Sequence, residues 1–188
     1  MSAVQSTGPV DPRDLRRAAA RFPTGVALVT APGGLALIID SFVSVSLEPA
    51  LVAFSVSRTS LTWRRMRATG RFGINVLAAR HAQGIRERAQ PGADRLDGLD
   101  LEVLANGVPV LRNALAVIVC TLESEHATGD HTLPIARVDE VRHGRDEPPL
   151  VFFGGNFGTI DAQSFDPATS CVADTQIACV RLSARVPA

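Results

Sequence analysis

The chain has 188 residues, of which 46% are hydrophobic, so it can bury one sizeable core and leaves little room for a second complete domain. Its 19 basic and 19 acidic residues cancel, and no stretch concentrates positive charge, which argues against nucleic acid or an anionic membrane as a partner. All 19 basic residues are arginine and tyrosine is absent, which excludes a P-loop lysine, a Schiff-base lysine and a Tyr-Lys catalytic pair.

The first residues have neither the cationic start nor the apolar run of a signal peptide, and no apolar run reaches membrane-spanning length. We therefore expect a soluble, cytoplasmic protein. Cys120, Cys171 and Cys179 have no CxxC spacing, and the histidines form no HExxH motif. We expect free thiols and no metal site.

The first half of the chain predicts interleaved helices and strands. Residues 1–10 are expected to form a flexible arm. Asp11 and Pro12 then begin a helix that ends at Pro23 and has an apolar face. That face is formed by Leu15, Ala18, Ala19 and Phe22. The next predicted elements are a hairpin of 26–31 and 35–39, a strand 51–57, a helix from Ser60 or Thr62 to Gly70, and a strand 71–77.

The second half predicts mostly strands. A helix over 79–89 and a loop over 90–98 come first. The strands that follow are expected at 101–104, 108–111, 114–125, 133–142 and 150–153. So many short strands, with few helices for parallel crossovers, favour a mostly β fold in which an antiparallel sheet closes into a barrel. Residues 11–160 form the expected domain, and 161–188 a tail of unassigned role.

Two serine-rich segments are candidates for ligand binding. Residues 39–49 place Ser41, Ser44 and Ser46 among apolar residues, where hydroxyls could bind the polar edge of a planar ligand; a strand with serines on its outer face is an equal alternative. Residues 57–62 combine Ser57, Arg58, Ser60 and Thr62 ahead of Trp63 at a helix start, which suits a phosphate. Ordinary N-capping explains Ser60 or Thr62 equally well.

Two glycine-containing turns are further candidates. In Gly129-Asp130-His131, Asp130 could accept a hydrogen bond that orients His131, although a solvent-exposed turn histidine is the preferred interpretation from these residues alone. Residues 154–158 (GGNFG) match no nucleotide-binding motif and predict either a plain turn or a phenylalanine-bearing edge over a bound aromatic ring.

Six fragments in order resemble the flavin reductase family, whose members have an FMN-binding split-barrel fold and serve as the small partner of two-component flavin-dependent monooxygenases. The fragments are RFPTGVALVTA (21–31), DSFVSVSLEPALVAFSVSRTSLTW (40–63), RFGINVLA (71–78), DRLDG (94–98), GDHTLPIARV (129–138) and PLVFFGGNFG (149–158). The resemblance implies an antiparallel split β-barrel with a few flanking helices. It also implies a homodimer that transfers hydride from NADH or NADPH to FAD or FMN for a partner monooxygenase.

The resemblance also implies roles for particular residues. The PTGV turn and the serine-rich segment 41–47 would line the isoalloxazine ring, residues 55–63 would hold the ribityl and phosphate groups, and His131, the one expected catalytic residue, would lie near the nicotinamide with the edge after PLVFF. The full expected cofactor-binding set is Thr24, Gly25, Ile39, Asp40, Ser41, Phe42, Ser44, Ser46, Ser55, Val56, Ser57, Ser60, Thr62, Trp63, Arg71, Phe72, His131, Phe153, Gly154 and Phe157.

The chain departs from the family pattern at Asp40, where the family usually has asparagine. A negative charge there is unfavourable beside a flavin that gains electrons unless it is paired or points away. Two other functions remain: a non-catalytic flavin-binding barrel that acts as a sensor or carrier, and a serine hydrolase using Ser41 or Ser44 with His131, for which no nucleophile elbow is present.

Overall fold

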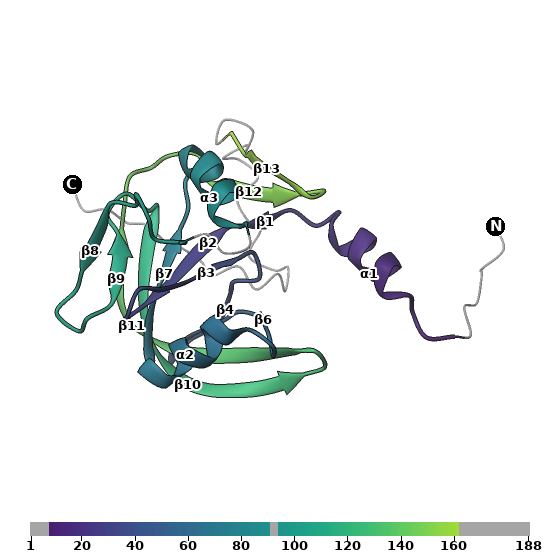
Figure 1. Cartoon of the computed structure of the whole chain (residues 1–188), viewed down its shortest axis with the longest axis horizontal. Helices are drawn as coiled ribbons and strands as arrows, with labels where there is room; N and C mark the ends of the chain where they lie inside the picture. The colour runs from purple at the N-terminus through teal and green to yellow at the C-terminus, as the bar shows by residue number, and fades with distance from the viewer. Residues whose placement is uncertain (1–7, 91–93, 162–188) are drawn as a thin grey trace.

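The computed structural model describes residues 8–90 and 94–161, which form three antiparallel sheets and short helices (Figure 1). The main sheet runs in the order β3-β2-β7-β10-β11-β5-β4, and β6 also pairs with β11. Its strands are β2 (Ala27–Ala31), β3 (Leu35–Ile39), β4 (Val43–Leu47), β5 (Ala50–Ala53), β6 (Val56–Ser57), β7 (Arg71–Val76), β10 (Ala116–Thr128) and β11 (His131–His143). This mostly antiparallel architecture confirms the fold class predicted from the sequence.

Two smaller sheets complete the strands. One has the order β1-β12-β13 and lies at the top of Figure 1, and the other pairs β8 with β9. Their bounds are β1 (Thr24–Gly25), β12 (Leu150–Phe153), β13 (Asn156–Thr159), β8 (Leu101–Val103) and β9 (Pro109–Leu111). The segment 154–158 is therefore not a plain turn. Gly154 and Gly155, with φ of 58° and 83°, form the turn, and the following residues make a strand that returns along β12.

The helices are short. They are α1 (Pro12–Ala19), α2 (Leu61–Thr69), the 3-10 turn η1 (Ala79–His81) and α3 (Ala82–Arg88). For α2, the Ser60 hydroxyl accepts a hydrogen bond from the Trp63 backbone N–H, and Gly70 closes the helix with a φ of 67°. Among the described residues, no helix is long and apolar enough to cross a membrane.

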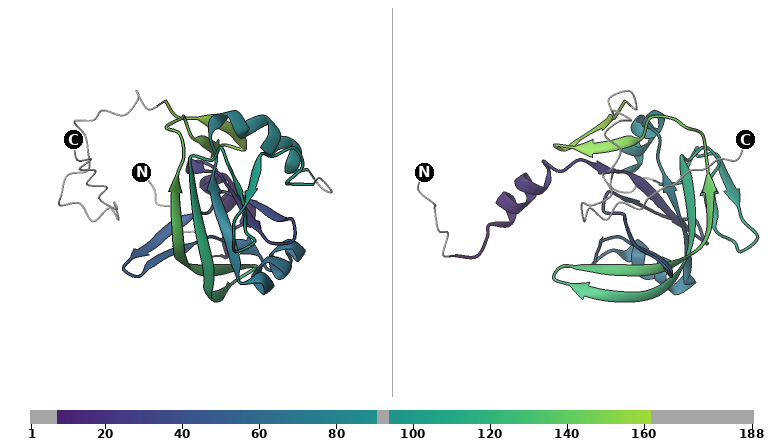
Figure 2. Two further views of the ribbon diagram at one scale, coloured as in Figure 1. Left: turned by 90° about the vertical axis from the view of Figure 1, so that its left-hand side faces the viewer. Right: turned by 180° about the vertical axis from the view of Figure 1, so that it is seen from behind.

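The apolar face predicted for α1 is not buried. Asp11 caps the helix as expected, but α1 extends away from the barrel (Figures 1 and 2), with Leu15 63% and Phe22 72% exposed. The periodicity of apolar residues correctly predicted a helix. It does not show what the helix packs against, and no described residue of this chain covers its apolar side.

The core divides into two clusters because side chains alternate across each strand. In β2, Val29 faces the cluster that contains Phe54, Trp63 and Phe72, whereas Leu28 faces the other cluster. The rings of Phe54 and Trp63 meet edge to face with centroids 5.4 Å apart. The central strands are therefore buried on both faces. The residues that line pockets come from the ends of these strands and from the elements around them.

One local prediction needs correction, and the prediction of a buried free thiol is confirmed for Cys120. The strand expected over 51–57 is divided into β5 and β6, and Ser55 lies in the break between them. Cys120 is a buried free thiol, and burial raises its pKa to about 12, so it stays protonated. Cys171 and Cys179, the arm before residue 8 and the tail after Asp161 lie outside the described residues.

Candidate functional site

Two pockets meet at Asp40, between the end of β3, the strand β1 and the β12–β13 hairpin. We refer to them together as the Asp40 cleft, because both are lined by Asp40 and Phe152. The larger has a volume of about 390 Å³ and the smaller about 230 Å³. The larger is lined also by Arg16, Ala19, Ala20, Phe22, Thr24 and Ser41, and the smaller by Val26, Ile38, Ile39 and Phe157.

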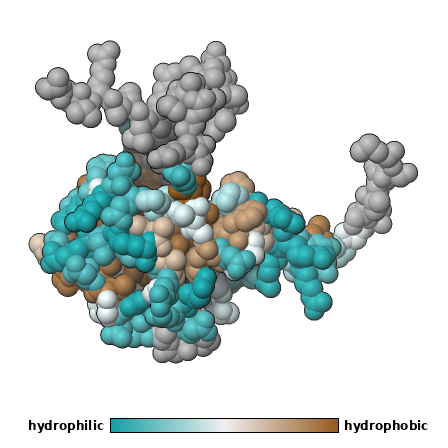
Figure 3. Space-filling model, turned by 90° about the horizontal axis from the view of Figure 1, so that it is seen from above, coloured by the Kyte–Doolittle hydropathy of each residue, from teal (hydrophilic) through white to brown (hydrophobic). Residues whose placement is uncertain are grey.

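The walls of the Asp40 cleft are largely apolar, with aromatic rings on one side. Phe152 on β12 and Phe157 on β13 are register partners, and their ring centroids lie 5.4 Å apart. Figure 3 views the molecule from above and shows apolar surface in the middle of this face, flanked by hydrophilic surface. An aromatic wall of this kind suits a flat conjugated ligand.

Thr24, which lines the Asp40 cleft, has a buried polar atom without a partner among the described residues. The Thr24 hydroxyl oxygen is buried and makes no hydrogen bond within the described part of the chain. An unpaired buried hydroxyl costs about 1–3 kcal/mol. A ligand with a hydrogen-bonding edge would remove this cost, so the cleft has the chemistry of a ligand site.

The Ser41 hydroxyl has a structural role. It donates to the Ser55 carbonyl at 3.1 Å and accepts from the Ser55 backbone N–H at 3.0 Å. This pair of bonds joins the segment after β3 to the break between β5 and β6. Ser41 therefore shapes the cleft wall while its hydroxyl is already engaged, and neither it nor Ser44 bonds His131 within the described residues.

The predicted phosphate segment and the predicted histidine turn are brought together by pairing of β6 with β11. His131 is the register partner of Ser57. The Arg58 backbone N–H donates to the Asp130 carbonyl at 3.1 Å, and the Arg58 guanidinium donates to the Gly129 carbonyl at 3.2 Å. Residues more than 70 positions apart in sequence thus form one unit at the end of the barrel.

The side chain of His131 is 45% exposed, and Asp130 makes the contact that the sequence offered as an alternative to a plain turn histidine. The Nδ1 atom of His131 lies 2.7 Å from an oxygen of the Asp130 carboxylate. This contact lowers the pKa of Asp130, chiefly through the hydrogen bond and secondarily through charge. Gly129 provides the turn, with a φ of 62°. Within residues 8–90 and 94–161, the other ring nitrogen of His131 has no hydrogen-bond partner and is available to a ligand.

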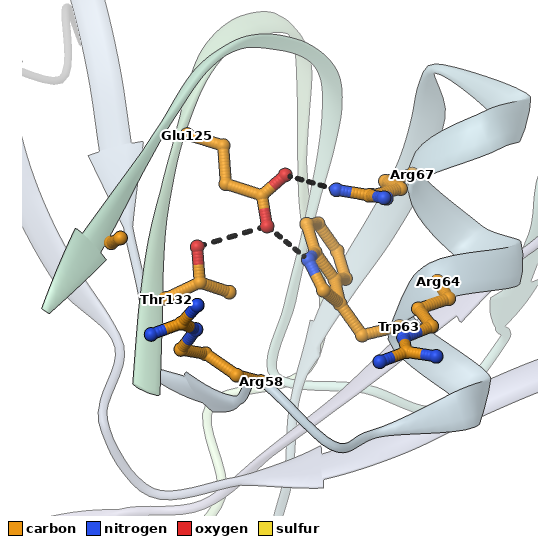
Figure 4. Close-up of a pocket in the computed structure, with 7 residues that line it drawn as sticks. Arg58, Trp63, Arg64, Arg67, Glu125 and Thr132 are labelled. Atoms are coloured by element: carbon orange, nitrogen blue, oxygen red, sulfur yellow. Dashed lines mark hydrogen bonds and ion pairs between the residues drawn. The ribbon is translucent and has the colours of Figure 1, made fainter. Parts of the chain in front are cut away.

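A third pocket, of about 340 Å³, lies between α2 and the β10–β11 hairpin (Figure 4). We refer to it as the arginine pocket. Its lining residues are Arg58, Trp63, Arg64, Arg67, Glu125, Ala127 and Thr132. Three guanidinium groups against one carboxylate leave the lining net positive, which suits an anionic group.

Four of the side chains that line the arginine pocket are already connected to one another, with Glu125 at the centre. One Glu125 oxygen accepts from Trp63 Nε1 and from the Thr132 hydroxyl, both at 2.9 Å, and the other accepts from Arg67 at 3.2 Å. Burial tends to raise the pKa of Glu125, but these three donors outweigh burial and hold that pKa below its ordinary value. Figure 4 shows the three groups converging on the carboxylate.

The structure gathers only part of the expected cofactor-binding set around the Asp40 cleft. Five of its members line the cleft, and four others lie at the β6–β11 unit or at the start of α2. The five are Thr24, Ile39, Asp40, Ser41 and Phe157. The four are Ser57, Ser60, Thr62 and His131, of which Ser57 bonds Thr59 at 2.9 Å and Ser60 caps the helix.

The remaining expected residues are not part of these walls. Gly25 pairs with Val151 in β1, Phe42 packs on the core, and Ser44 and Arg71 are exposed. Ser46 and Ser55 are half-buried, Val56 is buried, and Gly154 donates its backbone N–H to Ala20. Trp63 has its side chain in the core, and its indole N–H contributes to the arginine pocket instead.

Two further expected residues are absent from the cleft lining. Phe152 lines the cleft and Phe153 does not, because successive side chains of a strand point to opposite faces. Phe72 is fully buried against Phe54 and Trp63, so its ring supports the core. The sequence also missed Arg16, Glu125 and Thr132, whose neighbours in the pockets are distant along the chain.

Known proteins similar to this chain point to one family. The model of the flavin reductase like domain matches residues 19–161. A reductase subunit of a flavin-dependent monooxygenase from Rhodococcus jostii is 35% identical, with 85% of this chain and 83% of that protein covered. A flavin reductase from Pseudomonas putida is also 35% identical, with 79% of this chain and 90% of that protein covered.

Solved structures give the same picture. The NADH:FAD oxidoreductase of Streptomyces globisporus, solved with NAD and FAD fragments, is 30% identical and superposes with a TM-score of 0.76, covering 85% of this chain and all of that one (100%). Component B of nitrilotriacetate monooxygenase from Mycobacterium thermoresistibile superposes with a TM-score of 0.79 at 29% identity, covering 84% of this chain and 91% of that one.

Proposed function

The chain belongs to the flavin reductase family, and from that premise we propose that it transfers hydride from NADH to FAD or FMN and supplies the reduced flavin to a partner flavin-dependent monooxygenase. Relatives named as NADH-dependent flavin and FAD reductases support the reaction, and a relative named as a monooxygenase reductase subunit supports the partner. The observation in this chain that carries the proposal is the Asp40 cleft, with its aromatic wall and its unpaired Thr24 hydroxyl.

The Asp40 cleft fits the ring of a flavin. Phe152 and Phe157 offer a surface on which a flat conjugated ring can pack, and Ile38 and Ile39 offer apolar surface nearby. The Thr24 hydroxyl needs a partner, and the ring edge of a flavin carries carbonyl and nitrogen acceptors. In this proposal Thr24 donates to the ring and fixes its orientation.

The phosphate end of the flavin would lie at the β6–α2 junction. Here α2 begins at Ser60, and the backbone N–H groups of a first helical turn attract anions. Ser57, Thr59 and Arg58 add hydroxyl and guanidinium donors to the same junction. The bonds from Arg58 to the turn at 129–130 hold this junction in place before a ligand arrives.

The nicotinamide would lie beside His131. The Asp130 contact fixes the ring of His131, whose free nitrogen can then hydrogen-bond a carboxamide. When bound together, the nicotinamide and flavin supply the hydride chemistry themselves, and the protein supplies position and exclusion of water. This division suits a chain without lysine or tyrosine, since none of its residues has to act as a strong base.

We infer further that the protein works as a homodimer in the cytoplasm. Along β4, Val43 and Val45 are each 50% exposed and Leu47 is 64% exposed. The apolar side of α1 is also exposed to solvent. A second copy would bury these surfaces, and because Phe22, in the turn that follows α1, lines the Asp40 cleft, dimer formation would also close that cleft. Analytical ultracentrifugation is expected to give twice the mass of the chain.

Anaerobic mixing of the protein with oxidised FAD or FMN and each reduced nicotinamide tests the proposed reaction. We expect the visible absorbance of the flavin to bleach with NADH and to return when oxygen is admitted. A protein that binds flavin but leaves it oxidised would instead be the carrier or sensor considered from the sequence.

A further inference from the structure

Asp40 is the acidic residue that lines the Asp40 cleft. It follows β3, is exposed, and lines both pockets of the cleft. The other charged residue of the lining is Arg16 on α1, and no ion pair or hydrogen bond engages the Asp40 carboxylate within the described residues. Within the described residues, no cation or hydrogen-bond donor is therefore in direct contact with its charge.

Hydride transfer changes the charge of the flavin that would lie beside this carboxylate. The C4–H bond of the dihydronicotinamide breaks, its two electrons and the hydrogen form the new N5–H bond of the flavin, and the nicotinamide leaves as a cation. The ring system that accepts the hydride gains one negative charge, unless it then takes a proton from water. A nearby carboxylate repels this product more than it repels the neutral oxidised ring.

We propose that Asp40 is a specificity-determining residue that selects between redox states, weakening the binding of reduced flavin relative to oxidised flavin so that the product is released to another protein. The inference rests on the proposed function and on the placement of the ring in the Asp40 cleft. It gives this chain a reason to carry a carboxylate in an apolar, aromatic-walled cleft, where a charge would otherwise hinder ligand binding.

The test compares the wild-type protein with Asp40→Asn, Asp40→Ala and the control Asp146→Asn. Asp146 is exposed and lies outside the lining of the three pockets of the candidate site. The dissociation constants of oxidised flavin and of chemically reduced flavin are measured for each protein under anaerobic conditions. The midpoint potential of the bound flavin is then obtained by titration as a second readout.

We divide the dissociation constant of reduced flavin by that of oxidised flavin. In both Asp40 variants we expect this ratio to fall about tenfold, which corresponds to about 1.4 kcal/mol. For a two-electron couple this raises the potential of the bound flavin by about 30 mV. Asp146→Asn is expected to leave the ratio unchanged. Removal of the charge is the shared feature of the two Asp40 variants, so both must respond.

A ratio unchanged in both Asp40 variants would overturn the proposal. A change in Asp40→Asn alone would also overturn it, because the new amide donor would then be the cause. These outcomes are separate from failure of the proposed function, since the binding measurements use chemically reduced flavin. If the wild-type protein does not reduce flavin with NADH, the proposed reaction is wrong, regardless of the result for the Asp40 variants.

Discussion

The arginine pocket and the Asp40 cleft differ in how their polar groups are satisfied. In the arginine pocket, Trp63, Arg67 and Thr132 all donate to the Glu125 carboxylate. In the Asp40 cleft, the Thr24 hydroxyl is buried without a partner and the Asp40 carboxylate is unpaired within the described residues. The Glu125 network satisfies its own members and stabilises the fold, whereas the open groups of the Asp40 cleft can be satisfied by a ligand.

The largest effect is expected at Glu125. Glu125→Ala removes the acceptor of three donors and leaves the indole N–H of Trp63 and the hydroxyl of Thr132 unpaired. We expect the free energy of unfolding to fall by about 2–3 kcal/mol, measured by urea denaturation. Glu123→Ala, an exposed change on the same strand, is the matched control and should have little effect. Equal losses in the two variants would contradict a structural role for the network.

Thr24→Val should act in the opposite direction on stability. Because it removes an unpaired buried hydroxyl, we expect the ligand-free protein to gain about 1 kcal/mol of stability. The same change removes the proposed donor to the flavin, so the dissociation constant of oxidised flavin should rise about fivefold to tenfold in a fluorescence titration. Thr128→Val, at an exposed position of β10, is the control. Tighter flavin binding by Thr24→Val would contradict a flavin ring that accepts a hydrogen bond from Thr24.

His131→Ala tests the site at the nicotinamide side. We expect the KM for NADH to rise about fivefold, since one neutral hydrogen bond contributes about 1 kcal/mol, while the flavin dissociation constant stays within twofold of wild type. His126→Ala on the same hairpin is the control, because His126 contacts Ser124 and does not line the arginine pocket. Unchanged NADH oxidation in the His131 variant would remove this residue from the site.

The smallest effect is the pH dependence of the Glu125 network. The pKa of Glu125 is lower in the folded protein than in the unfolded chain, where it is 4.5. The stabilising contribution of the Glu125 charge is therefore present above pH 4.5 and is lost as the pH falls through the pKa of the folded state. The stability difference between wild type and Glu125→Gln should therefore shrink below about pH 4.5. A difference that stays constant down to pH 3 would show that the charge of Glu125 is not what the network uses.

Sequence patterns predicted the local elements well where a turn or cap was explicit. Gly33 and Gly34 join β2 and β3, with positive φ at both, and Ser60 and Gly70 delimit α2 as expected. The strand β13 was missed because Asn156-Phe157-Gly158-Thr159 lacks a run of β-branched residues, and it is a strand only because β12 provides its hydrogen-bond partners.

The site was harder to predict than the fold. Fragment order in the sequence brought Thr24, Asp40 and Phe157 into one hypothesis, and the structure places these three in one cleft. The sequence hypothesis included Phe153 and left out Phe152, because two adjacent phenylalanines fit either face of a strand until its register is known. Nor could it pair Trp63 with Glu125, which are 62 positions apart and meet only when the hairpin folds over α2.

The most direct test of this account is a crystal structure of the protein with oxidised FAD. It is expected to show the isoalloxazine ring in the Asp40 cleft against Phe152, with the Thr24 hydroxyl within hydrogen-bonding distance of the ring edge. A ring bound in the arginine pocket, with Thr24 still unpaired, would contradict the account.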